Sequence, residues 1–230
     1  MILIHIDMKH LNKILAMLGL TTILMASCKQ NQVEPTALAS LNVTNAVIGG
    51  ATLTLNTSAL TVNNNNYSQF SVIAGQSQIT LYPAATPANV YYNQTISTSN
   101  GDYYSLFLAG SSPSTVDAVL IKESYKNYTD SLCGVRFINL APGSPAISVN
   151  ITGNATNEVA SLAYKGYSNF IKYPAKATNT SYAFQIKNAS TGVVLASTTL
   201  STPRFHNVTI VFRGLVGSSP AAGITTVNDY

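Results

Sequence analysis

Two short blocks, Leu41-Asn42-Val43-Thr44-Asn45 and Thr52-Leu53-Thr54-Leu55-Asn56, alternate apolar with polar side chains. A period of two places every second side chain on the same face of an extended strand. Beyond Ala37, Thr, Tyr, Val and Ile are frequent, and Gly, Pro and Asn clusters such as Gly49-Gly50 break the runs. Turn residues at intervals of about 8 to 12 residues are typical of sandwiches and barrels. The pattern therefore predicts half-buried antiparallel strands and an all-β fold.

The same pattern recurs later in the chain, which indicates an internal duplication. The matched segments are Leu41–Asn45 with Val135–Asn139, Thr52–Asn56 with Ala146–Asn150, Tyr67–Phe70 with Tyr167–Phe170, and Tyr104–Gly110 with Val208–Gly214. The stretch between the copies, Glu123–Asp130, is polar and contains Tyr. We therefore predict two tandem immunoglobulin-like antiparallel β-sandwich domains, over residues 39–122 and 132–230.

The first residues have the organisation of an export signal. A short basic head, Met8–Lys13, precedes the run Ile14–Ala26, in which only Thr21 and Thr22 are polar. This run is too short for the roughly 20 apolar residues that cross a bilayer, but it fits a signal-peptide core. We interpret residues 1–27 as a signal peptide, and because Met1–Asp7 suits no basic head, we expect translation to start at Met8.

The apolar run ends in Leu24-Met25-Ala26-Ser27-Cys28, which resembles the lipobox of bacterial lipoproteins. The resemblance implies cleavage before Cys28 and lipidation of its thiol, so that acyl chains hold the protein at a membrane. An ordinary secretory signal with an incidental Cys is the alternative. Residues 28–38 are mostly polar and lack periodicity, so we expect a flexible tether. Ten extended residues reach about 35 Å.

The charge distribution speaks against nucleic-acid binding. Charged residues make up 9% of the chain, and the net charge is +4. No Lys or Arg lies between Gln30 and Ile121, and the nine cations that follow are spaced singly along the chain. Phosphate backbones are bound by several cations on one face. We therefore expect a solvated surface and no nucleic-acid partner.

The sequence offers no catalytic, cofactor-binding or metal-binding motif, and we predict that the chain is not an enzyme. His206 is the only His after Cys28, and no Gly-x-Ser-x-Gly or phosphate-binding glycine loop is present. The chain contains the Ser, His and acidic residues that a catalytic triad needs, but no motif places them together. His206 follows Pro203 and is interpreted as a turn or strand-edge residue. Cys133 has no partner once Cys28 is lipidated, and we expect it to be a buried apolar residue.

The second copy also resembles a known family. Arg136–Ile147, with its Asn139 and Pro142 to Pro145 turn, then Tyr164–Phe170 and Thr209–Gly214, is similar to the domain of unknown function 4397 family of bacterial surface lipoproteins. The first copy resembles the family more faintly. Gly49-Gly50 stands where the second copy has its proline turn, and no Arg lies beside its first strand. The resemblance implies an exported β-sandwich without established activity. From the residues, Asn139 is expected to end a strand and bond the following backbone.

These observations predict a non-enzymatic lipoprotein that is anchored to the outer membrane or cell surface and acts as an interaction or structural module. Its partners would be the membrane, through the lipid on Cys28, and an envelope protein. Thirteen Tyr residues suit contact surfaces, and Tyr91, Tyr92, Tyr103 and Tyr104 are the candidate ligand contacts. Binding of a surface glycan is the alternative, although the chain has no Trp for stacking on sugars.

Overall fold

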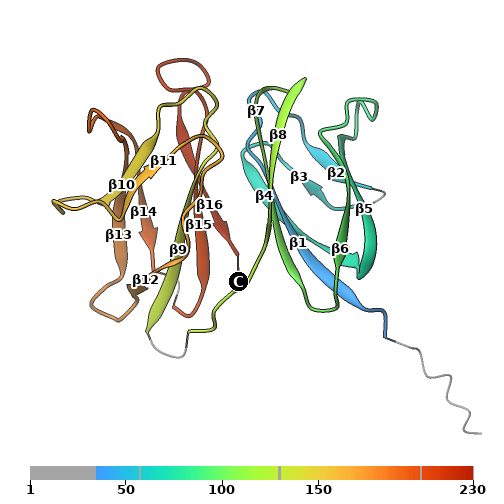
Figure 1. Ribbon diagram of the computed structural model, residues 1–230, viewed down its shortest axis with the longest axis horizontal. Helices are drawn as coiled ribbons and strands as arrows, with labels where there is room; N and C mark the ends of the chain where they lie inside the picture. Colours follow the sequence, from blue (N-terminus) through green and yellow to red (C-terminus); the bar gives the residue numbers. More distant parts are fainter. Residues whose placement is uncertain (1–34, 57, 129–130, 203, 230) are drawn as a thin grey trace, which may run out of the picture. The chain divides into compact units, whose positions relative to one another are not determined.

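The computed structural model describes residues 35–56, 58–128, 131–202 and 204–229, which contain β-strands and no helix (Figure 1). No helix in these ranges could span a membrane. The strands are β1 Leu38–Asn45, β2 Leu53–Leu55, β3 Thr61–Val62, β4 Asn66–Ile73, β5 Gly75–Pro83, β6 Tyr92–Thr98, β7 Tyr103–Ser112, β8 Thr115–Lys122, β9 Leu132–Asn139, β10 Ile147–Ile151, β11 Val159–Leu162, β12 Ile171–Pro174, β13 Ser181–Asn188, β14 Val194–Ser201, β15 Asn207–Arg213 and β16 Gly223–Asn228.

These strands form four four-stranded sheets, which pair into two sandwiches. The first sandwich has sheets in the order β4-β1-β7-β8 and β3-β2-β5-β6, and the second has β12-β9-β15-β16 and β11-β10-β13-β14. The prediction of an all-β chain with two tandem sandwiches is confirmed. Residues 37–230 together form one compact unit.

The strand order refines the immunoglobulin-like expectation. An immunoglobulin constant-type sandwich has seven strands in sheets of four and three, whereas each sandwich here has eight strands in two sheets of four. The first strand of each sandwich lies between the fourth and the seventh strands. The pairs β1–β7 and β9–β15 are parallel, and the other described strand pairs are antiparallel. All six pairs of neighbouring strands therefore recur in the same places in both sandwiches.

The strand registers place the matched sequence segments at equivalent positions. Leu41 lies opposite Tyr104 in the first sandwich, and Val135 lies opposite Val208 in the second. On the other side of β1, Thr44 pairs with Tyr67 of β4, and on the other side of β9, Ile138 forms a bridge to Tyr167. The sequence match thus corresponds to the same position in two copies of one topology.

Asn45 and Asn139 end the first strand of each sandwich with the same turn. Each Oδ1 atom accepts a hydrogen bond from the backbone N–H two residues later, at 3.4 Å in the first copy and 3.1 Å in the second. Each Nδ2 donates to a backbone carbonyl, of Ala51 and Leu162 respectively. Both Asn residues are fully buried. The predicted role of Asn139 is confirmed, and a buried amide of this kind must have such partners to be tolerated.

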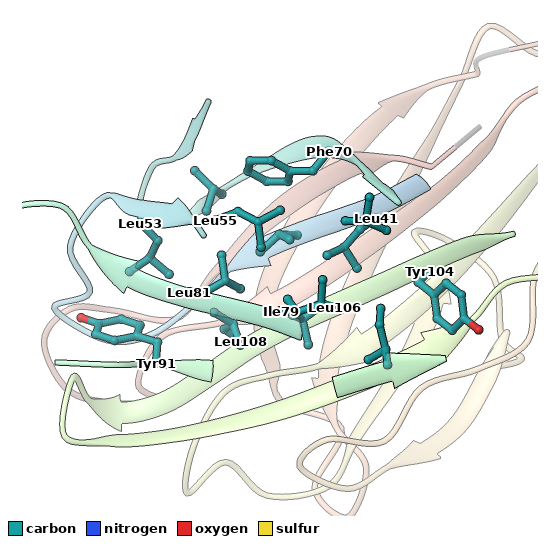
Figure 2. Packing of buried hydrophobic residues seen from close by; sticks show 14 of the residues in the cluster. Leu41, Leu53, Leu55, Phe70, Ile79, Leu81, Tyr91, Tyr104, Leu106 and Leu108 are labelled. Carbon is teal, nitrogen blue, oxygen red and sulfur yellow. The ribbon is translucent and has the colours of Figure 1, made fainter. Parts of the chain in front are cut away.

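Each sandwich encloses its own hydrophobic core. In the first, Figure 2 shows Leu81 of β5 together with Leu41 of β1 and Leu106 of β7, so the two sheets meet through apolar side chains. In the second, Phe137 and Phe184 are fully buried, and their ring centroids lie 5.1 Å apart in an edge-on arrangement. The alternating strands of the sequence supply these inward faces.

A third buried cluster joins the two sandwiches through the outer faces of their β1-containing and β9-containing sheets. Its buried members are Ala46, Phe107, Ala109, Ile138, Leu140, Val211 and Val227. Strands β7, β9 and β15 are consequently buried on both faces over most of their length. This differs from the expected half-buried strands, because a strand between two apolar layers loses its solvent-facing side.

Polar contacts reinforce this junction. The Tyr164 hydroxyl donates a hydrogen bond to Asp117 at 3.0 Å, and the Lys165 ammonium pairs with the same carboxylate at 3.0 Å. The Thr225 hydroxyl donates to the backbone oxygen of Asn65 at 3.0 Å. Residues from both sandwiches thus meet through apolar packing and through directed hydrogen bonds.

Candidate functional site

The four tyrosines predicted as ligand contacts do not share one exposed surface. Tyr91 is buried in the first core, and its hydroxyl oxygen accepts a hydrogen bond from the backbone N–H of Ala51 at 3.3 Å. Tyr92 packs against the same core, and burial raises the pKa of its hydroxyl. Both rings therefore contribute to the packing of the first sandwich.

Tyr103 and Tyr104 are neighbours on β7 and point to opposite faces of the sheet, as successive strand residues must. Tyr104 is buried in the first core, and its hydroxyl donates to the backbone oxygen of Ser97 at 2.9 Å. Tyr103 contacts the ring of Tyr125 edge-on, with centroids 5.6 Å apart. The structure thus brings Tyr103 to the segment between the two sandwiches and Tyr104 to the interior.

The most heavily charged buried site surrounds Arg136, at the junction of the two sandwiches. The guanidinium makes a two-pronged contact with Glu123, with N–O distances of 2.8 and 3.1 Å, and its Nε donates to the Thr209 hydroxyl at 3.0 Å. Its face lies 4.5 Å from the ring centroid of Phe170. A second carboxylate, Asp229, lies 3.7 Å from the guanidinium. These charged side chains are at most 3% exposed.

Local sequence positions each member of this cluster. Arg136 lies on β9 and Thr209 opposite it on β15, in parallel register. Glu123 directly follows β8, and its backbone N–H donates to the Tyr103 oxygen at 2.8 Å. The backbone N–H of Asp229, just after β16, donates to the Asn207 oxygen at 3.0 Å. The cluster therefore joins the end of the first sandwich to three strands of the second.

One cation faces two carboxylates here, so a full set of charges would leave an excess negative charge in a buried place. Burial raises the pKa of Asp229 to about 7; the nearby Arg136 charge and the hydrogen bond from Thr209 oppose the rise, and Glu123 adds to it. The Thr209 hydroxyl donates to one Asp229 oxygen at 2.5 Å, while the other oxygen has no hydrogen-bond partner. A protonated Asp229 balances the charge of the cluster.

We expect an Asp229→Asn variant to change how stability depends on pH. The usual pKa of this carboxyl is 3.8. Below that pH both states carry the proton, whereas between about pH 4 and pH 7 only the folded state keeps it. The free energy of unfolding therefore falls as pH rises through this window, by at most about 1.4 kcal/mol per pH unit.

Asp229→Asn removes that fall, so the variant should match the parent at or below about pH 4, exceed it increasingly as pH rises, and keep a constant lead above about pH 7. Urea unfolding at several pH values measures the difference. Asp117→Asn is the control, because its carboxylate is 42% exposed and lies outside the cluster. The Lys165 hydrogen bond lowers the pKa of Asp117, so this variant should lower stability by a constant amount between about pH 5 and pH 7 and leave the slope unchanged. Parallel pH profiles for the parent and Asp229→Asn would contradict the assignment.

A second candidate site is a cavity of about 370 Å³ beside this junction. It is lined by Ser124, Lys126, Tyr128, Asn169, Phe170, Lys172 and Asn207. Phe170 separates the cavity from Arg136, because its ring also faces the guanidinium. An aromatic ring with two ammonium groups suits a ligand that carries negative charge.

The cations after Ile121 are less scattered than their spacing suggested. Lys126 and Lys172 line one cavity, Lys176 lines the next with Ser131 and Leu132, and the Arg204 guanidinium donates to the Ser131 hydroxyl. The expectation of singly placed cations is therefore wrong for these four. They are separated in sequence, but the segments that carry them all pass the start of β9.

The other residues singled out from the sequence have structural positions. Cys133 is fully buried in the second core, as predicted, and burial raises the pKa of its thiol to about 11. His206 is exposed in the turn before β15. Within the described ranges, no three His, Cys, Asp or Glu residues lie close enough to hold a metal ion. Cys28 and the predicted signal peptide lie outside the described residues.

Comparison with known proteins supports the same family, but the match falls mainly on the first copy, where the resemblance in the sequence is fainter. No curated protein matches the chain. Residues 39–150 match the family described as Domain of unknown function (DUF4397). The matched region holds all strands of the first sandwich and most of the first two strands of the second. The match supports the assignment of this part of the chain, residues 39–150, to the DUF4397 family.

Proposed function

We propose that the chain is an exported lipoprotein that is held at the outer membrane or cell surface by lipid on Cys28. The observation that carries this proposal is the basic and apolar leader that ends in Leu24–Cys28. Two or more acyl chains anchor a protein stably where one chain would not. The ten residues from Cys28 to Ala37 lead into the compact unit that starts at Ala37.

A Cys28→Ala variant tests the anchor. Because no thiol would remain to receive the lipid, we expect the uncleaved precursor to accumulate and the mature form to disappear from the membrane fraction. Globomycin, which blocks the lipoprotein signal peptidase, should have the same effect on the parent. Immunoblots of fractionated cells and mass spectrometry of the N-terminus provide the measurement.

Cys133→Ala is the matched control, since it removes the other thiol from a buried core position. We expect this variant to be cleaved and lipidated like the parent. Normal cleavage and membrane retention of Cys28→Ala would refute the anchor. The same result would favour an ordinary secretory signal.

For the folded part we propose a non-enzymatic interaction or structural module made of two copies of the family domain. The equivalent registers, the shared strand order and the equivalent Asn45 and Asn139 turns support the second copy. The third buried cluster and the Arg136 cluster support a role as a rigid two-sandwich platform. Rigid scaffolds of this kind present loops and strand edges to partners.

The alternative of glycan binding through the four candidate tyrosines has less support. Tyr91 and Tyr104 are 6% and 8% exposed, so their rings offer little surface on which a sugar could stack. The lipoprotein proposal does not depend on these residues.

A further inference from the structure

Four cations gather at one end of the second sandwich, around the start of β9. We call this surface the basic end and define it by Lys126, Lys172, Lys176 and Arg204. Among the described residues, none of the four forms an ion pair, whereas Lys122, Arg136 and Lys165 each do. The acids Glu123 and Asp229 lie around Arg136 on the other side of the Phe170 ring, and neither is described in an ion pair with these four cations.

The basic end also presents an exposed aromatic side chain in an unusual conformation. Phe205 is 46% exposed and has a φ of 69°. A bulky residue rarely adopts this left-handed region, and such outliers persist where the surroundings enforce them, often at functional sites. The backbone N–H of Phe205 donates to the Leu132 oxygen at 2.8 Å, which holds the loop against β9. The Arg204 guanidinium lies 5.6 Å from the centroid of the Phe205 ring.

A short series of contacts connects the basic end to the strand that follows the tether. Ser40 on β1 pairs with Tyr103 on β7, and the Tyr103 ring contacts Tyr125. The Tyr125 ring contacts Phe170 with centroids 5.9 Å apart, and Phe170 lines the cavity that holds Lys126 and Lys172. Figure 1 shows the start of β1 and the start of β9 at the same end of the two sandwiches.

We propose that the basic end rests on the anionic phospholipid headgroups of the membrane that holds the Cys28 lipid. This inference rests on the proposed lipid anchor. Lysine and arginine near an anionic leaflet attract its phosphates, and an aromatic ring beside them suits the boundary between headgroups and acyl chains. Docking in this way would orient the two sandwiches relative to the membrane, with β9 starting at its surface.

Apolar residues at the same end of the first sandwich favour a membrane over a soluble acidic ligand. Leu38 and Ile73 are cross-strand partners at the start of β1, and they are 42% and 64% exposed. Exposed apolar side chains beside the tether match an interface with lipid, whereas a soluble polyanion would gain nothing from them. A tether of at most about 35 Å also keeps this end near the bilayer.

The test uses a single fluorescent reporter. The chain has no Trp, so Phe205→Trp introduces the only one. The full lipidated protein carrying this substitution is reconstituted into vesicles of phosphatidylcholine, with or without phosphatidylglycerol, and into matched vesicles with brominated lipids. We expect a blue-shifted emission and strong quenching by brominated lipid in the phosphatidylglycerol vesicles, and neither in phosphatidylcholine alone.

Charge variants and a second reporter make the test specific. Lys126→Gln with Lys172→Gln should lower the ratio of docked to undocked protein roughly 25-fold, because each cation near an anionic surface contributes about fivefold. Lys126→Arg with Lys172→Arg should leave it unchanged. Val194→Trp is the matched reporter, since Val194 is 45% exposed at the opposite end of the second sandwich. It should show no shift in either type of vesicle.

Several results would overturn the proposal. They are equal Phe205→Trp spectra in the two vesicle types, insensitivity to the paired Gln substitutions, or an equal shift when soluble polygalacturonate replaces the anionic vesicles. The last result would assign the basic end to acidic glycans. Failure of the lipid anchor is recognised separately, because the N-terminal mass would then lack acyl chains before any vesicle is prepared.

Discussion

Replacement of Arg136 by Met is expected to lower the free energy of unfolding by about 3 to 5 kcal/mol. The substitution keeps most of the side-chain volume but leaves the Glu123 carboxylate buried without its cation, beside a protonated Asp229. Removal of one partner of a buried ion pair costs more than the pair contributes, since the remaining charge cannot be solvated. Contact with the Phe170 ring is also lost.

Urea unfolding followed by circular dichroism measures this loss. Lys187→Met is the matched control, because Lys187 lies on β13 of the same sandwich, and no ion pair is described for it. We expect it to change stability by less than about 0.5 kcal/mol. Glu123→Gln added to Arg136→Met should recover a large part of the loss, since no net charge then stays buried. A small effect of Arg136→Met alone would mean that water reaches the cluster.

The duplication was predictable because it depends on local pattern. The alternating residues of Leu41–Asn45 and Val135–Asn139 form the inner faces of equivalent strands, and the register places the two blocks in the same position of two sheets. Asn139 could be placed at a strand end because its side chain bonds the backbone two residues away. Hydrogen bonds between residues two positions apart depend only on the local sequence.

The packing of one sandwich against the other was not predicted. A clue was present in Leu106-Phe107-Leu108-Ala109 and in Ile210-Val211-Phe212, which are apolar at successive positions. Such runs indicate strands buried on both faces. Because these strands were predicted to be half-buried, no packing partner was predicted for their outer faces. The third cluster depends on which two sheets meet, and that choice is made by surfaces far apart in the sequence.

The candidate sites were the least predictable feature. The Arg136 cluster combines residues at positions 123, 136, 209 and 229, and no spacing in the sequence relates them. The tyrosines were chosen as Tyr residues of one copy that suit contact surfaces, but adjacent strand residues face opposite ways, so Tyr103 and Tyr104 separate. The basic end escaped notice because its cations come from three different segments, which only the fold brings together.

The second large effect is expected at two glycines that end the matched segments, Gly110 within β7 and Gly214 directly after β15. Gly110 and Gly214 have φ angles of 149° and 86°. A Cβ atom on Gly214 would lie 2.5 Å from the backbone oxygen of Ala221, and one on Gly110 would come closer still to that of Thr115. Both neighbouring atoms belong to the backbone of the same polypeptide, so no side-chain rotation can remove the clash.

We therefore expect Gly214→Ala and Gly110→Ala each to cost at least about 3 kcal/mol, from left-handed strain and from displacement of the neighbouring backbone. Gly217→Ala separates the two causes, since Gly217 has a φ of 72° and open space where its Cβ would lie. That control should cost only about 1 to 2 kcal/mol, the strain alone. Urea unfolding of the three variants provides the comparison. If Gly214→Ala lost no more stability than Gly217→Ala, the loop after β15 would have to yield to the added methyl group, and the close approach at the end of this strand would not be what requires glycine there.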